Sequence, residues 1–249
     1  MWMRTTINYQ HSKGLSTRQA LAALYAEGGL TRFYRGLWAA LLQAPLSRFG
    51  DTASYAGISA LLENVDLAPS LKTLCASLTA ALFRIGITPI DTLKTTLQVE
   101  GKEAYSLLIN KVKKGGPTVL FQGALGNALA SFVGNYPWYL TFNFLQEAIP
   151  AVSADQLLLK LMRAALCGFL ATCVSDCTSN SIRVLKTTRQ TSATEISYRE
   201  AATQIIEKEG VLGLFARGLG TRLLTNGIQA SLFSVLWKLF EDMFANKGL

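Results

Sequence analysis

Polar and ionisable side chains recur at a spacing of about four residues inside three apolar stretches of the sequence. They are Gln43, Ser47, Arg48 and Asp51 in the first stretch, Asn127, Ser131 and Asn135 in the second, and Arg222, Thr225, Asn226 and Gln229 in the third. A spacing of four keeps side chains on one face of a helix. Such side chains can bind a polar solute through hydrogen bonds and ion pairs. Three polar helix faces of this kind indicate one polar cavity between the helices.

Two further charges occupy equivalent places in the sequence. Arg84 precedes Lys94 by ten residues, and Asp176 precedes Lys186 by ten. We expect Arg84 and Asp176 to pair across the cavity and to help bind a modest polar solute, zwitterionic or anionic. The alternative is that these residues only hold helices together, because buried ion pairs and hydrogen bonds can also be structural.

Signals for catalysis are absent from the sequence. The single histidine, His11, lies in a polar segment and is expected to be solvated. No phosphate-binding glycine loop, metal-ligand cluster or activated nucleophile can be recognised. The four cysteines, all within apolar runs, are expected to be buried packing residues. The sequence therefore predicts a protein that is not an enzyme and needs no cofactor or metal.

The composition favours a membrane protein. Half of the 249 residues are apolar and 16% are charged, against about 25% in a typical soluble domain. Apolar runs of more than 20 residues are long enough to span a bilayer. Basic segments (1–36, 91–123, 183–222) alternate with acidic ones (61–72, 146–160, 241–249), as on the two sides of a membrane. Nucleic-acid binding is not expected, because the basic residues flank spans instead of forming one polar face.

A tandem repeat organises the chain. An apolar run is followed by Pro89, Asp91, Lys94 and Gln98. From Lys94 on, the order is a basic residue, Thr-Thr and an amide, and this order recurs from Arg4, 90 residues before Lys94, and from Lys186, 92 residues after it. We expect Pro89 to kink its helix. A glycine motif ending in Gly36, Gly123 and Gly218 follows each copy. A period this long indicates repetition of a whole structural unit. We predict a single domain with repeats at about 1–66, 67–152 and 153–249.

Each predicted unit is a span, a short basic amphipathic helix and a second span. The predicted spans are 37–62, 71–98, 119–148, 157–190 and 211–244, and the short helices are 17–26, 104–114 and 198–208. Residues 1–10 read as the tail of a helix, so we expect an all-α membrane protein with five full spans. We favour the interpretation that it is a truncated version of a six-span protein.

On these residues the chain resembles the mitochondrial carrier family. The family signature is Pro-x-(Asp/Glu)-x-x-(Lys/Arg), followed by Gly, four residues, an aromatic, a basic residue and Gly, three times over. Pro89, Asp91 and Lys94 match it fully, and Tyr34-Arg35-Gly36 match the glycine motif. The resemblance implies six tilted helices around a central cavity, closed alternately on each side. It also implies a multi-pass protein of the mitochondrial inner membrane, surrounded by its lipids, which we expect to be a monomer.

The resemblance implies a matrix-side gate as well, built from the signature residues. Its predicted members are Arg4, Asp91, Lys94, Gln98, Arg183, Lys186 and Gln190. The acid of one signature is expected to pair with the base of the next, and here only Asp91 with Lys186 survives. Ser181 and Arg183 replace the proline and the acid of the third copy, so we expect Arg183 to face Arg4 in a like-charge contact.

The gate on the opposite side is predicted to be loose. The matching offsets give three sets: Tyr55 and Ala56 with Ser59, Phe142 and Asn143 with Gln146, and Trp237 and Lys238 with Glu241. The first two sets are uncharged, and the third has its charges reversed. We predict alternating-access transport of a small polar solute. The alternative is a carrier-derived receptor or scaffold that no longer transports.

Overall fold

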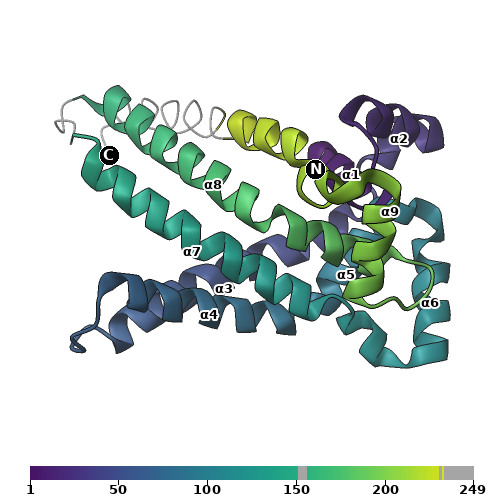
Figure 1. Cartoon of the computed structure of the whole chain (residues 1–249), viewed down its shortest axis with the longest axis horizontal. Helices are drawn as coiled ribbons and strands as arrows, with labels where there is room; N and C mark the ends of the chain where they lie inside the picture. Colours follow the sequence, from purple (N-terminus) through teal and green to yellow (C-terminus); the bar gives the residue numbers. More distant parts are fainter. Residues whose placement is uncertain (151–155, 230–231, 233–249) are drawn as a thin grey trace, which may run out of the picture.

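The computed structural model describes residues 1–150, 156–229 and 232, and within them the chain is helical throughout, without a strand (Figure 1). The α-helices are α1 (Trp2–Lys13), α2 (Thr17–Arg32), α3 (Leu37–Leu61), α4 (Pro69–Gly86), α5 (Thr88–Glu100), α6 (Ala104–Gly115), α7 (Ala124–Ala148), α8 (Leu157–Thr191) and α9 (Tyr198–Ala216). Two short 3-10 helices, η1 (Gly101–Glu103) and η2 (Pro117–Phe121), flank α6. Residues 219–229 form a further helical segment. The predicted all-α class is confirmed.

The four long helices α3, α4, α7 and α8 extend away from one end of the molecule, where α1, α2, α5, α6 and α9 gather (Figure 1). α3 packs against α4, α4 against α7, and α7 against α8. The α3–α4 contact is close: a Cβ built on Gly50 would lie 2.1 Å from the Phe83 ring. Any larger residue at Gly50 would require the Phe83 ring to move.

The short helices α2 and α9 begin in the same way. Ser16 accepts a hydrogen bond from the backbone N–H of Gln19, whose side chain accepts one from the backbone of Ser16. Ser197 and Glu200 repeat this capping box at α9. The box satisfies two N–H groups that have no partner within the helix. Both helices are then interrupted by non-helical glycines, at Gly28–Gly29 and at Gly210.

The bend in the second predicted span lies before the proline that was expected to cause it. α4 ends at Gly86 and α5 begins at Thr88, so the break is at Ile87, and the helical stretches 69–86 and 88–115 meet at 68°. Pro89 lies in the first turn of α5. A proline is tolerated there because the first N–H groups of a helix have no intrahelical partner.

Two other predicted boundaries were wrong. The third span was expected from Val119, but α7 begins at Ala124, after Gly123 adopts a left-handed conformation (φ 92°). The fifth span was expected from Val211, but residues 211–216 belong to α9 and the helix resumes at residue 219, beyond Gly218 (φ 67°). Glycine tolerates positive φ, so it ends one helix and reorients the next. Residues 233–244 of this span lie outside the described part of the chain.

The distribution of polar and apolar side chains is inverted relative to a soluble protein. Large apolar side chains of the long helices face outward, among them Leu41, Phe49, Leu82, Phe144 and Leu166. Buried positions in the same region include Ser47, Ser77, Asp91, Ser131, Asp176 and Ser179. A polar side chain facing lipid is costly, so membrane helices turn such groups inward.

Hydropathy alone identifies fewer spans than the five that were expected. Among the described residues, one helix (Leu158–Thr191) is both long and apolar enough to cross a membrane, and the bent pair 69–86 with 88–115 passes the same test together. α3 and α7 have 25 residues each, which is sufficient length at 1.5 Å per residue for a core of about 30 Å. Their polar faces lower the mean hydropathy.

Candidate functional site

Two arginine–aspartate pairs lie within the long helices, and they differ from the pair that was expected. Arg84 of α4 contacts Asp51 of α3 at 2.6 Å, and Arg222 contacts Asp176 of α8 at 2.5 Å. The prediction that Arg84 pairs with Asp176 was wrong. Each charge finds a partner on a neighbouring helix, because an ion pair requires contact and α3 packs directly on α4.

A buried carboxylate, Asp91 of α5, joins the two signature lysines. Lys94 lies 3.1 Å and Lys186 of α8 lies 2.5 Å from its oxygens. The expected pairing of Asp91 with Lys186 is therefore confirmed. Lys94 also donates to Gln43 Oε1 at 3.1 Å, and Lys186 donates to Asn127 Oδ1 at 2.9 Å. These bonds connect the gate residues to the polar stripes of α3 and α7.

The two signature glutamines connect α5 to α1 and to α8. Gln98 of α5 accepts a hydrogen bond from Asn8 of α1 at 2.5 Å. Gln190 of α8 donates to Thr92 of α5 at 3.0 Å. Thus α1, α5 and α8 meet at the end where the short helices gather, as Figure 1 shows for the helix ends. The predicted gate residues are brought together in space, although their role in gating remains a prediction.

Three of the arginines predicted for the gate and the binding site, Arg4, Arg48 and Arg183, have no ion pair within the described residues. The Arg183 guanidinium donates to Ser179 Oγ at 3.1 Å. The predicted like-charge contact between Arg183 and Arg4 stays a prediction.

The remaining predicted binding residues fall into two groups. Ser47 accepts a hydrogen bond from Gln43, Thr225 donates to the Thr221 carbonyl, and Asn226 donates to Asp176. Ser131, Asn135 and Gln229 make no hydrogen bond to the described residues; Ser131 is buried and Gln229 is exposed. The first group has structural partners, whereas the second keeps its polar groups available.

An aromatic contact links α3 to α7 towards the other end of the long helices. Tyr55 stacks on Tyr139, with ring centroids 4.7 Å apart and planes at 15°. Trp138 stacks on Phe142 at 5.0 Å, and Gln146 accepts hydrogen bonds from Arg163. Tyr55 and Phe142 were predicted for the gate at this end, whereas Tyr139 was not assigned to it. Trp237, Lys238 and Glu241 lie outside the described residues.

The sequence reading also missed three basic side chains that cap helix ends. Arg32 donates to the carbonyls of Gln98 and Val99 at the end of α5. Arg217 donates to the carbonyl of His11 at the end of α1, and Lys111 to that of Gln190 near the end of α8. Terminal carbonyls of a helix need such donors.

Glu27 and Glu209 hold the two capping arginines in place. Arg32 lies 2.6 Å from Glu27, and Arg217 bonds Glu209 through two nitrogens at 2.7 and 2.8 Å. In the sequence, each glutamate is followed directly by the glycine that breaks its helix. That shared Glu-Gly pair is the signal that could have marked the caps.

Two expectations about single residues were wrong. His11 is 1% exposed, because the loop at Gly218 covers its ring and α8 packs beside α1. Of the four cysteines, Cys167 alone is buried; Cys75 and Cys177 are exposed and Cys173 is intermediate. The helix faces that carry these two cysteines point outward, which the apolar runs could not reveal.

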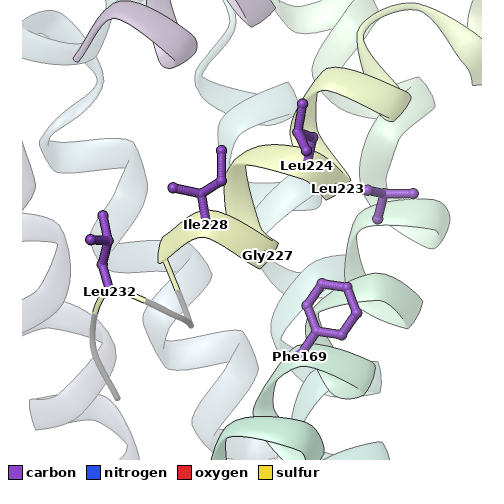
Figure 2. A pocket seen from close by; sticks show the side chains of 6 residues that line it. All are labelled: Phe169, Leu223, Leu224, Gly227, Ile228 and Leu232. Atoms are coloured by element: carbon purple, nitrogen blue, oxygen red, sulfur yellow. The ribbon is translucent and has the colours of Figure 1, made fainter. Parts of the chain in front are cut away.

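An apolar pocket of about 680 Å³ lies between α8 and the helical segment 219–229. Figure 2 shows Phe169 of α8 opposite Leu223, Leu224, Gly227, Ile228 and Leu232. None of the predicted binding residues lines this pocket. Its lining offers almost no hydrogen-bonding groups, so it does not suit a polar solute.

Comparisons with known proteins agree with this arrangement. The sequence profile described as "Mitochondrial carrier protein" matches residues 65–152 and 158–248. The mitochondrial thiamine pyrophosphate carrier of Pongo abelii is 24% identical over 70% of this chain and 60% of its own length. The mitochondrial glycine transporter of Saccharomyces cerevisiae is 26% identical over 64% and 57%.

The chain thus spans about 60% of the length of these two relatives. The mitochondrial thiamine diphosphate carrier 1 of Zea mays is matched more fully, at 24% identity over 96% of this chain and 82% of the relative. All three are named as mitochondrial proteins that carry or transport a small solute.

Proposed function

Because the chain belongs to the mitochondrial carrier family, we propose that it moves a small polar solute across the membrane by alternating access. The family also confirms the predicted location in the mitochondrial inner membrane. The substrates named for the relatives, thiamine pyrophosphate and glycine, are both small and polar. At about 25% identity they support the general class of solute and do not select one of them.

The observation that carries the proposal is the connection between gate and polar stripes. Lys94 bonds both Asp91 and Gln43, and Lys186 bonds both Asp91 and Asn127. A solute that competes for Gln43 or Asn127 would alter the hydrogen bonds of the two lysines that close the gate. Binding could then shift the balance between closed and open states, provided that the solute binds the two states unequally.

The Tyr55–Tyr139 contact between α3 and α7 supplies the second constriction that alternating access requires. Tyr55 and Tyr139 stack at the opposite ends of these helices from the Asp91 cluster. We propose that the solute binds between these two levels, near Asp51, Asn135 and Arg222. A monomer suffices for this mechanism, and neither an enzyme activity nor a cofactor enters it.

The test is uptake into liposomes that contain the protein in its full natural length. A labelled panel would span amino acids, carboxylates, nucleotides, cofactor precursors and inorganic anions. We expect saturable uptake of one class. Asn135→Ala should lower that uptake at least tenfold, because an amide that hydrogen-bonds the solute is lost.

Asp51→Asn should lower uptake as well, because it releases Arg84 from its carboxylate. The control is Arg18→Gln, an exposed residue of α2 that has no hydrogen bond or ion pair to the described residues. It should leave uptake unchanged. Failure of every solute to enter, with thermal unfolding still cooperative, would favour the receptor or scaffold alternative.

A further inference from the structure

The side chain of Asn127 connects its own helix, α7, to three others. Asn127 is 5% exposed. Its amide nitrogen donates to the Arg84 carbonyl of α4 at 3.2 Å and to the Thr88 hydroxyl of α5 at 3.4 Å. Its oxygen Oδ1 accepts a hydrogen bond from Lys186 of α8 at 2.9 Å. One buried amide therefore uses both its donor and its acceptor groups on neighbouring helices.

The two donor contacts lie at the break between α4 and α5. α4 ends at Gly86, so the Arg84 carbonyl belongs to its last turn, where carbonyl groups have no partner within the helix. Thr88, which begins α5 and is buried, donates its hydroxyl to the same carbonyl at 2.8 Å. Unpaired carbonyl groups are costly away from water. The two side-chain donors thus stabilise the bend of 68° between residues 69–86 and 88–115.

The acceptor contact of Asn127 reaches the predicted gate. Lys186, which donates to Asn127, also pairs with Asp91 at 2.5 Å. Asp91 lies in the first turn of α5, and its backbone N–H donates to the Ile87 carbonyl at the break. The bend and the gate pair are therefore joined twice, through the backbone of α5 and through Asn127. When α8 moves away from α5, as opening of this end requires, Asn127 loses the partner that orients its amide.

The third repeat differs in both the bend and the amide. Its counterpart of α4 and α5 is α8, which continues without a break from Leu157 to Thr191. The position that corresponds to Asn127, four residues after the repeat glycine, is Arg222, and this side chain pairs with the Asp176 carboxylate. Within the described residues, the amide accompanies the broken helix, and a charged side chain takes its place at the continuous one.

We infer that Asn127 is a positioning residue of the transport cycle, which couples the bend between α4 and α5 to the gate lysine Lys186. While Lys186 occupies Oδ1, the amide nitrogen is held against the Arg84 carbonyl and the bend is fixed. Once Lys186 withdraws, the amide is released and the angle between the two helices is free to change. This inference deepens the proposed function and rests on it for the movement of a solute.

The test measures the bend in the purified full-length protein. Leu71 of α4 and Ile109 of α6 are exposed and lie on the two sides of the break. In a background without the four native cysteines, Leu71→Cys and Ile109→Cys carry spin labels, and pulsed electron paramagnetic resonance gives the distribution of distances between them.

We expect Lys186→Gln to shift or broaden this distribution, because the donor to Asn127 Oδ1 is lost. In Asn127→Leu the distribution should already be broad, and adding Lys186→Gln should change it little. Such non-additivity is the sign of coupling between the two residues.

Two further variants separate the contacts of Asn127. Asn127→Asp keeps an acceptor for the gate lysine but cannot donate to the Arg84 carbonyl, so it should broaden the distribution. Thr88→Val removes the other donor to that carbonyl and should broaden it as well. Thr79→Val is the matched control and should leave the distribution unchanged, since the Thr79 hydroxyl bonds the carbonyl of Cys75 inside the unbroken part of α4.

Uptake kinetics distinguish positioning from solute binding. With a transported solute, Asn127→Leu should lower the maximal rate about tenfold and leave the half-saturating concentration unchanged, because hydrogen bonds of the moving helices are lost. Thr79→Val should match the wild type in both quantities. A raised half-saturating concentration with an unchanged maximal rate would assign Asn127 to solute binding and overturn the inference.

The outcomes separate this inference from the proposed function. A distribution that stays narrow in Asn127→Leu would overturn the inference whatever is transported. A shift caused by Lys186→Gln that is equally large with and without Asn127 would overturn it too, because the gate would then act on the bend through Asp91 alone. Coupled distributions in a folded protein that takes up no solute would support the coupling and count against transport.

Discussion

Asp91 shows how one residue can hold together helices that are distant in sequence. Asp91 is 3% exposed, and its carboxylate forms ion pairs with Lys94 in its own helix and with Lys186 in α8. Two lysines that share one carboxylate are stabilised only while that carboxylate is present. If it were neutral, two buried like charges would remain next to each other.

Asp91→Asn should therefore lower the free energy of unfolding by about 3–5 kcal/mol, the usual cost of breaking a buried pair. Adding Lys186→Gln should recover part of this loss, because one repelling charge is removed. Thermal unfolding of the wild type, both single variants and the double variant measures the coupling. If the double variant loses the sum of the two single losses, Asp91 and Lys186 are not coupled as the structure indicates.

At the scale of elements, the caps at the helix ends determine how α1, α5 and α8 are joined to the short helices. Arg217 connects the end of α1 to α9 through His11 and Glu209. The side chain of Arg217 is 6% exposed and that of Glu209 28%, so this pair is screened less than a surface pair. The cap also covers the polar end of α1 above the buried His11.

Arg217→Ala should reduce stability by about 3 kcal/mol, because it leaves Glu209 and the His11 carbonyl without their donor. This corresponds to a fall in unfolding temperature of roughly 6–12 °C for a chain of this size. Differential scanning calorimetry in detergent would measure it. The matched variant Arg18→Ala, on the exposed side of α2, should unfold at the wild-type temperature. If the two variants lowered the unfolding temperature equally, the Arg217 cap would contribute no more to stability than an exposed arginine does.

The corresponding cap at α5 should depend on pH through Glu27. Partial burial acts to raise the pKa of this carboxyl, but hydrogen bonds from Arg32 and Tyr9 and the charges of Arg32 and Lys13 outweigh burial and lower the pKa below its ordinary value of 4.5. A lowered carboxyl pKa means that the ionised form stabilises the fold. This stabilisation is present above pH 4.5 and is lost as the pH falls below it.

Glu27→Gln should thus destabilise the protein at pH 7 by at most about 1 kcal/mol, because the side chain is 42% exposed. The difference from wild type should shrink as the pH falls from 4.5 through the lowered pKa. Unfolding temperatures of both proteins across pH 3–7 would show the convergence. A difference that stays constant over this range would assign the effect to shape and not to charge.

At the scale of the whole molecule, three helices from three parts of the chain close one end. α1, α5 and α8 contact one another there, while the long helices extend towards the opposite end (Figure 1). Solute movement by alternating access requires this end to open. The proposal therefore implies that α1 and α8 separate during each cycle.

A disulfide between α1 and α8 should stop transport reversibly. The hydroxyl oxygens of Ser12 and Thr191 lie 2.8 Å apart, so cysteine sulfurs at these positions could approach bonding distance. In a background without the four native cysteines, Ser12→Cys with Thr191→Cys should lose uptake under oxidation and regain it with a thiol reductant. Each single cysteine variant is the control. Undiminished uptake by the cross-linked protein would show that α1 and α8 need not separate.

Much of this protein could be predicted from the sequence. The repeated signature and the polar stripes indicated the family, the helical class and the pairing of Asp91 with Lys186. The short helices α2 and α9 start where serine and a following Gln or Glu can form a capping box. These features are local or periodic: a cap needs residues three apart, and a buried face needs a spacing of four.

Tertiary structure alone decided which charged groups became partners and which became buried. Arg84 pairs with Asp51 and not with Asp176, and His11 is enclosed by the loop at Gly218. Both results depend on which helices lie side by side and how closely they pack. An ion pair or a buried ring is determined by distances of a few ångströms between segments far apart in the chain. Helical periodicity assigns a residue to a face but does not identify what that face will meet.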